Sequence, residues 1–310
     1  DLEGFAKALV ETGQNPILHD GHHIRCEISI GIATTRDCDD EAVADYDTML
    51  RRADFALYVS KNAGRDRATL YDAALDAEYK TRRAMTEALC ADVHSGKLDF
   101  HLQPKVDLAT GIVYGFETLA RWPWRDGTVG PEVFVPLAEA AGIATEIDLQ
   151  ILQKSALSVA RWNASHRTDF EISANMSAHH FSSDALPGKI DAILKASALP
   201  PNRLTLEITE SVQIQDWNRA RNLIASLRTR GIRIAIDDFG TGYSSLAYLR
   251  RLQADEVKID KALVDEIETS RQAHYIMNAI VELAQDHLGF DVVVEGVERA
   301  SQAQVLRDMG

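Results

Sequence analysis

The sequence has little cysteine and no long apolar run, and each shortage removes a class of protein. Its three cysteines, Cys26, Cys38 and Cys90, lie far apart without a CxxC pair. An odd number at this spacing argues against a disulfide framework or a zinc site and is typical of reduced thiols. No apolar segment approaches the ~18 residues of a membrane helix. We therefore expect a cytoplasmic protein, although a membrane anchor could precede Asp1 in a longer chain.

Basic residues are also in short supply. Lys and Arg number 33 against 47 Asp and Glu, which gives a net charge of −14. A protein that follows a nucleic-acid backbone needs clustered positive charge, so a nucleic-acid polymer is not an expected partner. A small anionic ligand stays possible because a bound metal ion can invert the local field. The length of 310 residues corresponds to about two domains.

The first 72 residues predict a few alternating helices and strands. Apolar residues at helical spacing begin at Leu2, and strict alternation predicts a half-buried strand over Ile24–Ile32. A second helix over Thr48–Ala63 should end at Gly64, followed by a short strand over Arg67–Tyr71. These elements are too few for an independent core, so we expect that a preceding segment is missing. Residues 73–96 predict a charged helical linker.

From residue 97 the pattern changes to short apolar segments that alternate with amphipathic helices. Repeated βα units indicate a parallel sheet, and seven strands favour a TIM-like (β/α) barrel without its last strand. An open doubly wound sheet is the alternative, although no GxGxxG follows a strand. The strands are expected at Leu98–Lys105, Val113–Leu119, Phe170–Met176, Leu204–Thr209, Ile232–Asp237, Glu256–Ile259 and Asp291–Glu295. Long helices are expected at Asp148–Asn163, Trp217–Arg230 and Glu266–Leu288.

Most of these strands carry an acid, an amide or a lysine near the same end. In a barrel these ends converge on one mouth. Carboxylates at that density repel one another, and a hard divalent cation such as Mg²⁺ or Mn²⁺ relieves the repulsion. The adjacent Asp237 and Asp238 suggest two ions, which together can clamp a phosphodiester. The residues of this group are Glu117, Asn175, Glu207, Asp237, Asp238, Lys258 and Glu295.

Several strings in this part of the chain resemble the EAL domain, the bacterial cyclic di-GMP phosphodiesterase family. Glu117-Thr118-Leu119 with Ala120-Arg121-Trp122 is similar to the motif that names the family. The other matching strings are Gln103-Pro104, Asn175-Met176-Ser177, Glu207-Ile208-Thr209-Glu210, the run Asp237 to Leu246, Lys258-Ile259-Asp260 and Glu295-Gly296-Val297-Glu298. The resemblance covers residues 97–310.

This resemblance implies a barrel that hydrolyses cyclic di-GMP to linear pGpG with two Mg²⁺ or Mn²⁺ ions. It implies metal ligands at Glu117, Asn175, Glu207, Asp237 and Asp238, and catalytic roles for Lys258 and Glu295. It implies substrate contacts for Gln103, Leu119 and Arg121, and anchors of the loop after Asp238 at Glu210 and Glu298. It also implies a homodimer formed through this domain and an upstream sensory domain.

Two features differ from the family pattern. Thr118 replaces the alanine of the motif, and the chain stops at Gly310, before the final strand and its active-site glutamine. We expect the native chain to continue. Degenerate relatives bind cyclic di-GMP as receptors without cleaving it, and this remains the alternative. A sugar-active barrel with a carboxylate pair is disfavoured, because it needs fewer acids and more aromatics than the 7% found here.

The N-terminal part resembles the C-terminal half of a GGDEF domain, the diguanylate cyclase fold. The matching strings are Ile28 to Ala33, Arg52 to Tyr58 and Lys61 to Arg65. Lys61 and Arg65 match positions that contact nucleotide phosphates, but they also suit the end of a helix. The predicted organisation is therefore a GGDEF fragment over 1–72, a linker over 73–96 and an EAL domain over 97–310.

Overall fold

A computed structural model describes residues 2–19, 22–24, 27–34, 46–209, 217–240 and 253–309. The chain divides into two compact units, Asp1–Glu87 and Ala88–Gly310. The two units are described separately below. Within the described ranges, no helix is both long enough and apolar enough to cross a membrane.

The first unit contains small sheets and helices. Strand β3 lies directly against α2. Gly31 on β3 is so close to this helix that a Cβ atom added at Gly31 would come within 2.1 Å of the Ala53 carbonyl oxygen. The buried Ser60 hydroxyl on α2 bonds to the Ile30 and Arg67 carbonyls at 3.0 and 3.2 Å. The elements are α1 (Leu2–Gln14), β1 (Ile17–His19), β2 (His22–Ile24), β3 (Ile30–Ile32), α2 (Tyr46–Asn62), β4 (Ala68–Leu70) and α3 (Ala73–His94).

The predicted strand over Ile24–Ile32 is wrong as a single element. Residues 27–29 do not form a strand. Within residues 27–32, the strand is β3 (Ile30–Ile32), which pairs in parallel with β4. The reason is local: the Ile28 amide donates to the Asp66 carboxylate at 3.4 Å instead of to a strand neighbour. The expected end of the second helix is confirmed, since α2 stops at Asn62 and Gly64 has a φ of +105°.

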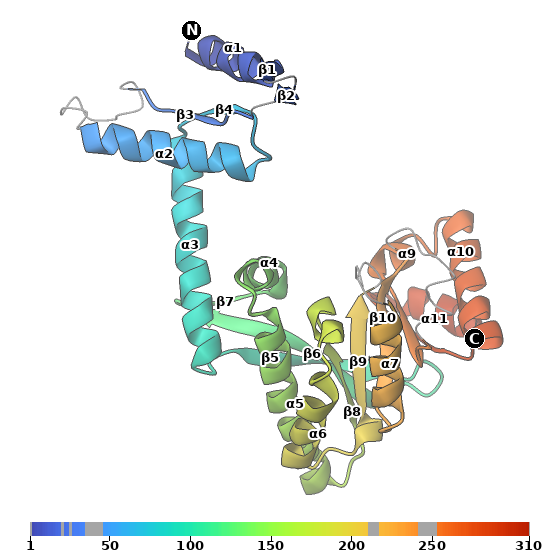
Figure 1. The fold of residues 1–310 in the computed structure, drawn as a ribbon. Helices are drawn as coiled ribbons and strands as arrows, with labels where there is room; N and C mark the ends of the chain where they lie inside the picture. Colours follow the sequence, from blue (N-terminus) through green and yellow to red (C-terminus); the bar gives the residue numbers. More distant parts are fainter. Residues whose placement is uncertain are drawn as a thin grey trace. The chain divides into compact units, whose positions relative to one another are not determined.

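The second unit is built on a curled sheet that forms half of a barrel (Figure 1). Its strands lie in the order β12-β11-β10-β9-β8-β6-β5, and β7 pairs with β6. This order follows the sequence without reversal, which rules out the doubly wound alternative for the described sheet. The strands are β5 (Asp99–Val106), β6 (Val113–Trp124), β7 (Gly127–Val129), β8 (Glu171–Asn175), β9 (Leu204–Thr209), β10 (Arg233–Phe239), β11 (Glu256–Ile259) and β12 (Asp291–Val294).

The expectation of a parallel sheet holds along the path β6-β8-β9-β10-β11-β12, whereas β5 and the short β7 both pair antiparallel with β6. Strands β5 and β6 are antiparallel, with Gln103 opposite Glu117. The connection explains this, because residues 107–112 form a short turn in which the Asp107 carboxylate accepts from the Thr110 amide at 2.7 Å. A parallel crossover needs a dozen or more residues.

Three helices, α5, α6 and α7, lie side by side and cover one face of the sheet (Figure 1). The predicted helix over Glu266–Leu288 is interrupted, because the Ser270 hydroxyl caps a new helix by accepting from the Ala273 amide at 3.2 Å. The helices are α4 (Pro131–Ala141), α5 (Ala144–His166), α6 (Leu186–Ser197), α7 (Trp217–Arg228), α9 (Lys261–Asp265), α10 (Arg271–Glu282) and α11 (Ala300–Met309). A π-helical turn follows α10 over Leu283–Leu288, and short 3₁₀ turns occupy Ala178–Ser182 and Pro201–Arg203.

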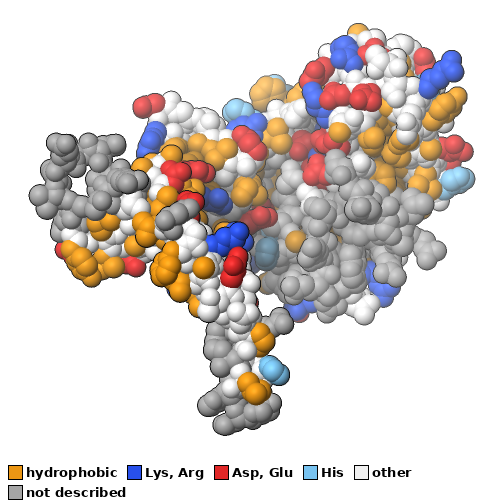
Figure 2. All heavy atoms as spheres, turned by 90° about the horizontal axis from the view of Figure 1, so that it is seen from above, with side chains coloured by type: hydrophobic (Ala, Val, Ile, Leu, Met, Phe, Trp, Pro, Cys, Tyr) orange, Lys and Arg blue, Asp and Glu red, His pale blue; other side chains and the backbone are white. Residues whose placement is uncertain are grey.

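Alternation along the strands separates an apolar face from a polar one. On β9, Leu204, Leu206 and Ile208 belong to the core shared with the helices. Thr205 and Glu207 lie between them and point to the opposite, inner face. The same period of two recurs on β8, β10 and β11, so polar side chains line the inside of the half-barrel. On the face drawn in Figure 2, acidic, basic and hydrophobic side chains are intermixed.

Candidate active site

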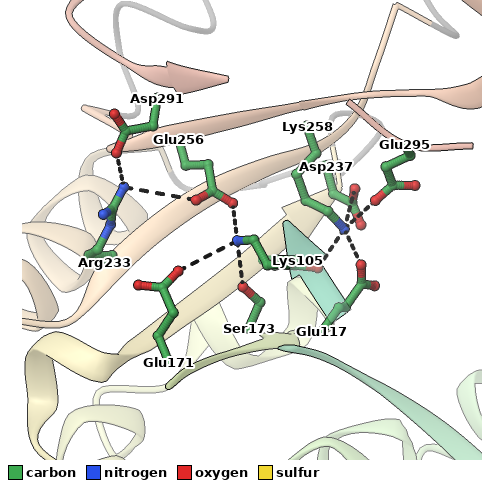
Figure 3. A network of polar contacts seen from close by, with 11 residues as sticks. Lys105, Glu117, Glu171, Ser173, Arg233, Asp237, Glu256, Lys258, Asp291 and Glu295 are labelled. Atoms are coloured by element: carbon green, nitrogen blue, oxygen red, sulfur yellow. Dashed lines mark hydrogen bonds and ion pairs between the residues drawn. The ribbon is translucent and has the colours of Figure 1, made fainter. Parts of the chain in front are cut away.

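Four carboxylates surround one lysine at the carboxyl end of the sheet. The Lys258 Nζ lies 3.0 Å from Glu117 Oε2, 2.7 Å from Glu207 Oε2, 3.0 Å from Asp237 Oδ1 and 2.6 Å from Glu295 Oε1 (Figure 3). These side chains come from β6, β9, β10, β11 and the residue after β12. We call this group, with Asn175, the mouth cluster.

The strand register explains why these residues meet. Asn175 at the end of β8 is paired with Glu207 on β9, and its amide donates to Glu117 Oε1 at 3.4 Å. Glu207 in turn is paired with Ala235, two residues before Asp237 on β10. Since side chains two apart share a face, all of these groups point into the half-barrel.

A bulge keeps a second aspartate near the mouth. The pairing of β10 with β11 shifts between Ile236 and Phe239, and Asp238 has a φ of +57°. The Asp238 amide donates to Asp237 Oδ1 at 3.0 Å. Burial and then the negative charge of Asp237 raise the pKa of Asp238. In a regular strand these neighbours would point to opposite faces, so the bulge allows both to act at one site.

The mouth cluster has more negative than positive charge. Burial raises the pKa of Glu207 to about 8, even though Lys258 acts in the opposite direction. Burial lowers the pKa of Lys258, but the surrounding carboxylates, Glu207 first, outweigh burial and raise it. Burial also raises the pKa of Glu295. Even with a proton on Glu207, one ammonium group cannot balance the three other carboxylates, so the site favours further cations.

The donor set fits divalent metal ions. Carboxylate and amide oxygens are hard ligands suited to Mg²⁺, Mn²⁺ or Ca²⁺. Glu207 Oε1 is buried and has no hydrogen-bond partner among the residues that the structure describes, which leaves a lone pair available inside the cluster. Within the described ranges, no three His, Cys, Asp or Glu side chains form a ready metal cage. At the mouth this is because the Lys258 ammonium occupies the centre of the acids.

The residues predicted to contact substrate lie beside the mouth cluster. Gln103 is exposed on β5, directly opposite Glu117. Leu119 and Arg121, two and four residues further along β6, line a cavity of about 390 Å³. Arg121 donates through Nε to His101 Nδ1 at 3.2 Å. The remaining lining residues are Thr128, Gly130, Pro131 and Glu132.

The two predicted loop anchors have different outcomes. Glu298 lies on the exposed segment before α11, where it pairs with Lys261. This ion pair lowers the pKa of Glu298. Glu210 lies outside the described residues, as do residues 241–252 of the loop that it was predicted to hold.

A second polar network at the amino end of the strands was missed by the sequence analysis. Lys105 Nζ lies 2.8 Å from Glu256 Oε1, 3.1 Å from Ser173 Oγ and 3.8 Å from Glu171 Oε1 (Figure 3). Arg233 joins Glu256 to Asp291. We call this group the floor network. One feature of the sequence pointed to this network. Lys105 lies two residues after Gln103 on β5, so both side chains are on the same, inner face of the sheet.

Comparison with known proteins identifies the second unit. The model of the EAL domain family matches residues 82–310. The chain belongs to the EAL domain family. In this EAL domain the structure brings to one mouth six of the residues that the motif strings predicted as metal ligands or catalytic groups, and the seventh, Asp238, lies next to Asp237. The six are Glu117, Asn175, Glu207, Asp237, Lys258 and Glu295.

Three known proteins illustrate the relationship. The bifunctional diguanylate cyclase/cyclic di-GMP phosphodiesterase MucR of Pseudomonas aeruginosa is 32% identical over 311 residues, which cover 100% of this chain and 45% of MucR. A solved structure of the PaMucR phosphodiesterase in complex with c-di-GMP is 35% identical, with a TM-score of 0.65, and covers 72% of this chain and 92% of that one. A calcium/cyclic di-GMP complex of Klebsiella pneumoniae BlrP1 is 29% identical, with a TM-score of 0.59, and covers 69% and 52%. The chain spans less than half the length of three curated relatives that it matches, MucR among them.

Proposed function

We propose that this EAL domain hydrolyses cyclic di-GMP to linear pGpG in a metal-dependent reaction. The mouth cluster is the observation that carries the proposal. It combines four carboxylates, an amide and a buried lysine within reach of one point, next to a cavity lined by Arg121. The complexes of PaMucR and BlrP1 with c-di-GMP support the choice of ligand.

We assign the metal ligands to Glu117, Asn175, Glu207, Asp237 and Asp238, with Mg²⁺ or Mn²⁺ as the ions. Divalent cations at these oxygens supply the positive charge that activates water and stabilises negative charge on a phosphodiester. The calcium complex of BlrP1 supports a divalent cation in this family.

In the reaction, the oxygen of a water molecule forms a bond to one phosphorus, the bond from that phosphorus to the opposite ribose oxygen breaks, and the ribose oxygen takes up a proton from solvent as it leaves. Glu295 lies at the rim of the cluster, with 32% of its side chain exposed, and accepts a proton from the water. Lys258 keeps its proton and donates hydrogen bonds to oxygens that gain negative charge. Arg121 bonds to the phosphate oxygens, which fixes the ring for attack, while Gln103 and Leu119 contact the substrate beside it.

We further propose that residues 1–72 belong to a GGDEF domain. The match to MucR covers the whole chain, and the name of MucR includes a diguanylate cyclase. Whether Lys61 and Arg65 contact nucleotide is part of this proposal; both side chains are exposed at the end of α2. A cytoplasmic location, a homodimer through the EAL domain and an upstream sensory domain remain predictions.

The deciding experiment separates nucleotide products after incubation with cyclic di-GMP and Mg²⁺ or Mn²⁺. The wild-type chain should release pGpG, and Glu117→Gln, which removes one charged ligand and keeps the size, should not. Binding of cyclic di-GMP with no product in either protein would show a receptor instead of an enzyme.

A further inference from the structure

Glu295 is the member of the mouth cluster with the least support from regular structure. It follows the last residue of β12, and its amide donates to the Ile259 carbonyl at 3.0 Å. Residues 295–299 then belong to no helix or strand before α11 begins at Ala300. The side chain of Glu295 is 32% exposed, against 0% for Glu207 and 10% for Asp237. Its position therefore depends on what holds the segment after it.

A fully buried glutamine on α11 bonds to this segment. The side chain of Gln302 is 0% exposed. Its Oε1 accepts from the amides of Glu298 and Arg299, both at 2.9 Å. Its Nε2 donates to the Val264 carbonyl on α9 at 3.3 Å. Gln302 thus joins the chain that follows Glu295 to the helix that follows Lys258.

The other polar contacts described between these two segments are at least partly exposed, while Val264 of α9 and Leu306 of α11 also share a buried apolar cluster. Lys261 pairs with Glu298, and Arg299 Nε lies 2.7 Å from Glu268 Oε2. Exposed ion pairs of this kind contribute little. The bonds of the buried Gln302 side chain contribute more, because their loss would leave two part-buried amides and the buried Val264 carbonyl without these partners.

We propose that Gln302 is a positioning residue that holds Glu295 against Lys258. The inference rests on the proposed function, since it assumes that Glu295 takes part in hydrolysis. Gln302 is the third residue of α11 and reaches back to the amide before the helix, which is half of a capping box. Glutamate serves the same purpose at that position. The simpler explanation is that Gln302 only caps α11, in which case it would affect stability but not turnover.

The test compares three single variants of the whole chain. Gln302→Leu keeps the approximate size and removes all three bonds. It should lower turnover by about 10²-fold, as a displacement of about 1 Å in a catalytic group can do. Gln302→Glu keeps both acceptor bonds and should restore turnover to within about fivefold of wild type. Ser270→Ala removes a cap from α10, away from the mouth cluster, and should lower the melting temperature without lowering turnover of the folded protein.

A double-mutant cycle and hydrogen exchange complete the test. In a Glu295→Gln background, Gln302→Leu should cause almost no further loss, because it acts through Glu295. Amide exchange over residues 295–299 should rise in Gln302→Leu. Losses that multiply in the double variant, or turnover of Gln302→Leu equal to that of Ser270→Ala, would overturn the inference. If the wild type releases no pGpG, the proposed function fails by itself. Unchanged exchange over 295–299 would then overturn the inference independently.

Discussion

The half-barrel buries one lysine at each end, and the two lysines have opposite surroundings. At the floor, Lys105 and Arg233 face acids whose charges they largely balance. At the mouth, Lys258 alone faces four carboxylates. Basic side chains and carboxylates therefore stabilise the fold in the floor network, and we propose that the same kinds of group bind cations in the mouth cluster. The difference lies in the ratio of charges, not in the type of residue.

The largest expected effect separates the two ends by activity. Asp237→Asn removes one charge from the mouth cluster and should reduce pGpG formation by at least about 10³-fold, because transition-state charge loses its stabilising metal. Asp291→Asn removes one charge from the floor network and should leave turnover within about threefold of wild type. Rates measured on the folded fraction of both variants check this. Equal losses would mean that the floor also serves catalysis.

The second prediction separates the two ends by stability. Lys105→Met removes the closer cationic partner of the buried Glu256 and leaves only Arg233, at 3.8 Å, among the described residues, which should cost up to about 3–5 kcal/mol of unfolding free energy with or without Mg²⁺. Lys258→Met should cost a similar amount in metal-free buffer. Added Mg²⁺ should recover most of that loss, because bound cations replace the ammonium and stabilise by mass action. Urea unfolding with and without Mg²⁺ measures both, and equal Mg²⁺ effects on the two variants would contradict the comparison.

The third prediction concerns pH. The pKa of Glu207 near 8 means that the folded chain holds a proton that the unfolded chain releases near pH ~4.3. In metal-free buffer the unfolding free energy should therefore fall as pH rises from about 5 to 8, by at most about 1.4 kcal/mol per pH unit from this group. Glu207→Gln should reduce this slope without abolishing it, since burial also raises the pKa of Glu171 and Glu295. Mg²⁺ should flatten the slope by competing with the proton. Melting temperatures across this range that rise with pH would be inconsistent with a protonated Glu207.

The smallest effect concerns the residue that departs from the family motif. Thr118 is buried, and in the described part of the chain its hydroxyl has no hydrogen-bond partner. Thr118→Val replaces the hydroxyl by a methyl group of similar size and should raise the unfolding free energy by about 1 kcal/mol. Turnover should not change, because Thr118 and Glu117 point to opposite faces of β6. A destabilised Thr118→Val would indicate that the hydroxyl has a partner in solution.

The sequence predicted the mouth better than the floor. Alternation and strand order placed Glu117, Glu207 and Asp237 at one end of a barrel, because strand ends converge in that fold. The pairing of Lys105 with Glu256 joins residues 151 positions apart across the inside of the half-barrel. No local period reports such a contact.

The antiparallel hairpin of β5 and β6 was missed for a different reason. Strand periodicity is the same in both directions, and only the short turn over residues 107–112 decides the direction. Glu298 was assigned from its motif alone, whereas its observed pairing with Lys261 depends on how the segment before α11 lies against α9.

Calorimetric titration of the metal-free chain with Mn²⁺ tests the central claim most directly. The account predicts that Mn²⁺ binds saturably to the wild type, with release of protons. It predicts the same for Lys105→Met, measured at a temperature where that variant is folded. It predicts binding weakened by at least about tenfold in Glu207→Gln, because that variant loses a buried anionic ligand. Binding that is absent from the wild type, or unchanged in Glu207→Gln, would contradict the assignment of the mouth cluster as the cation site.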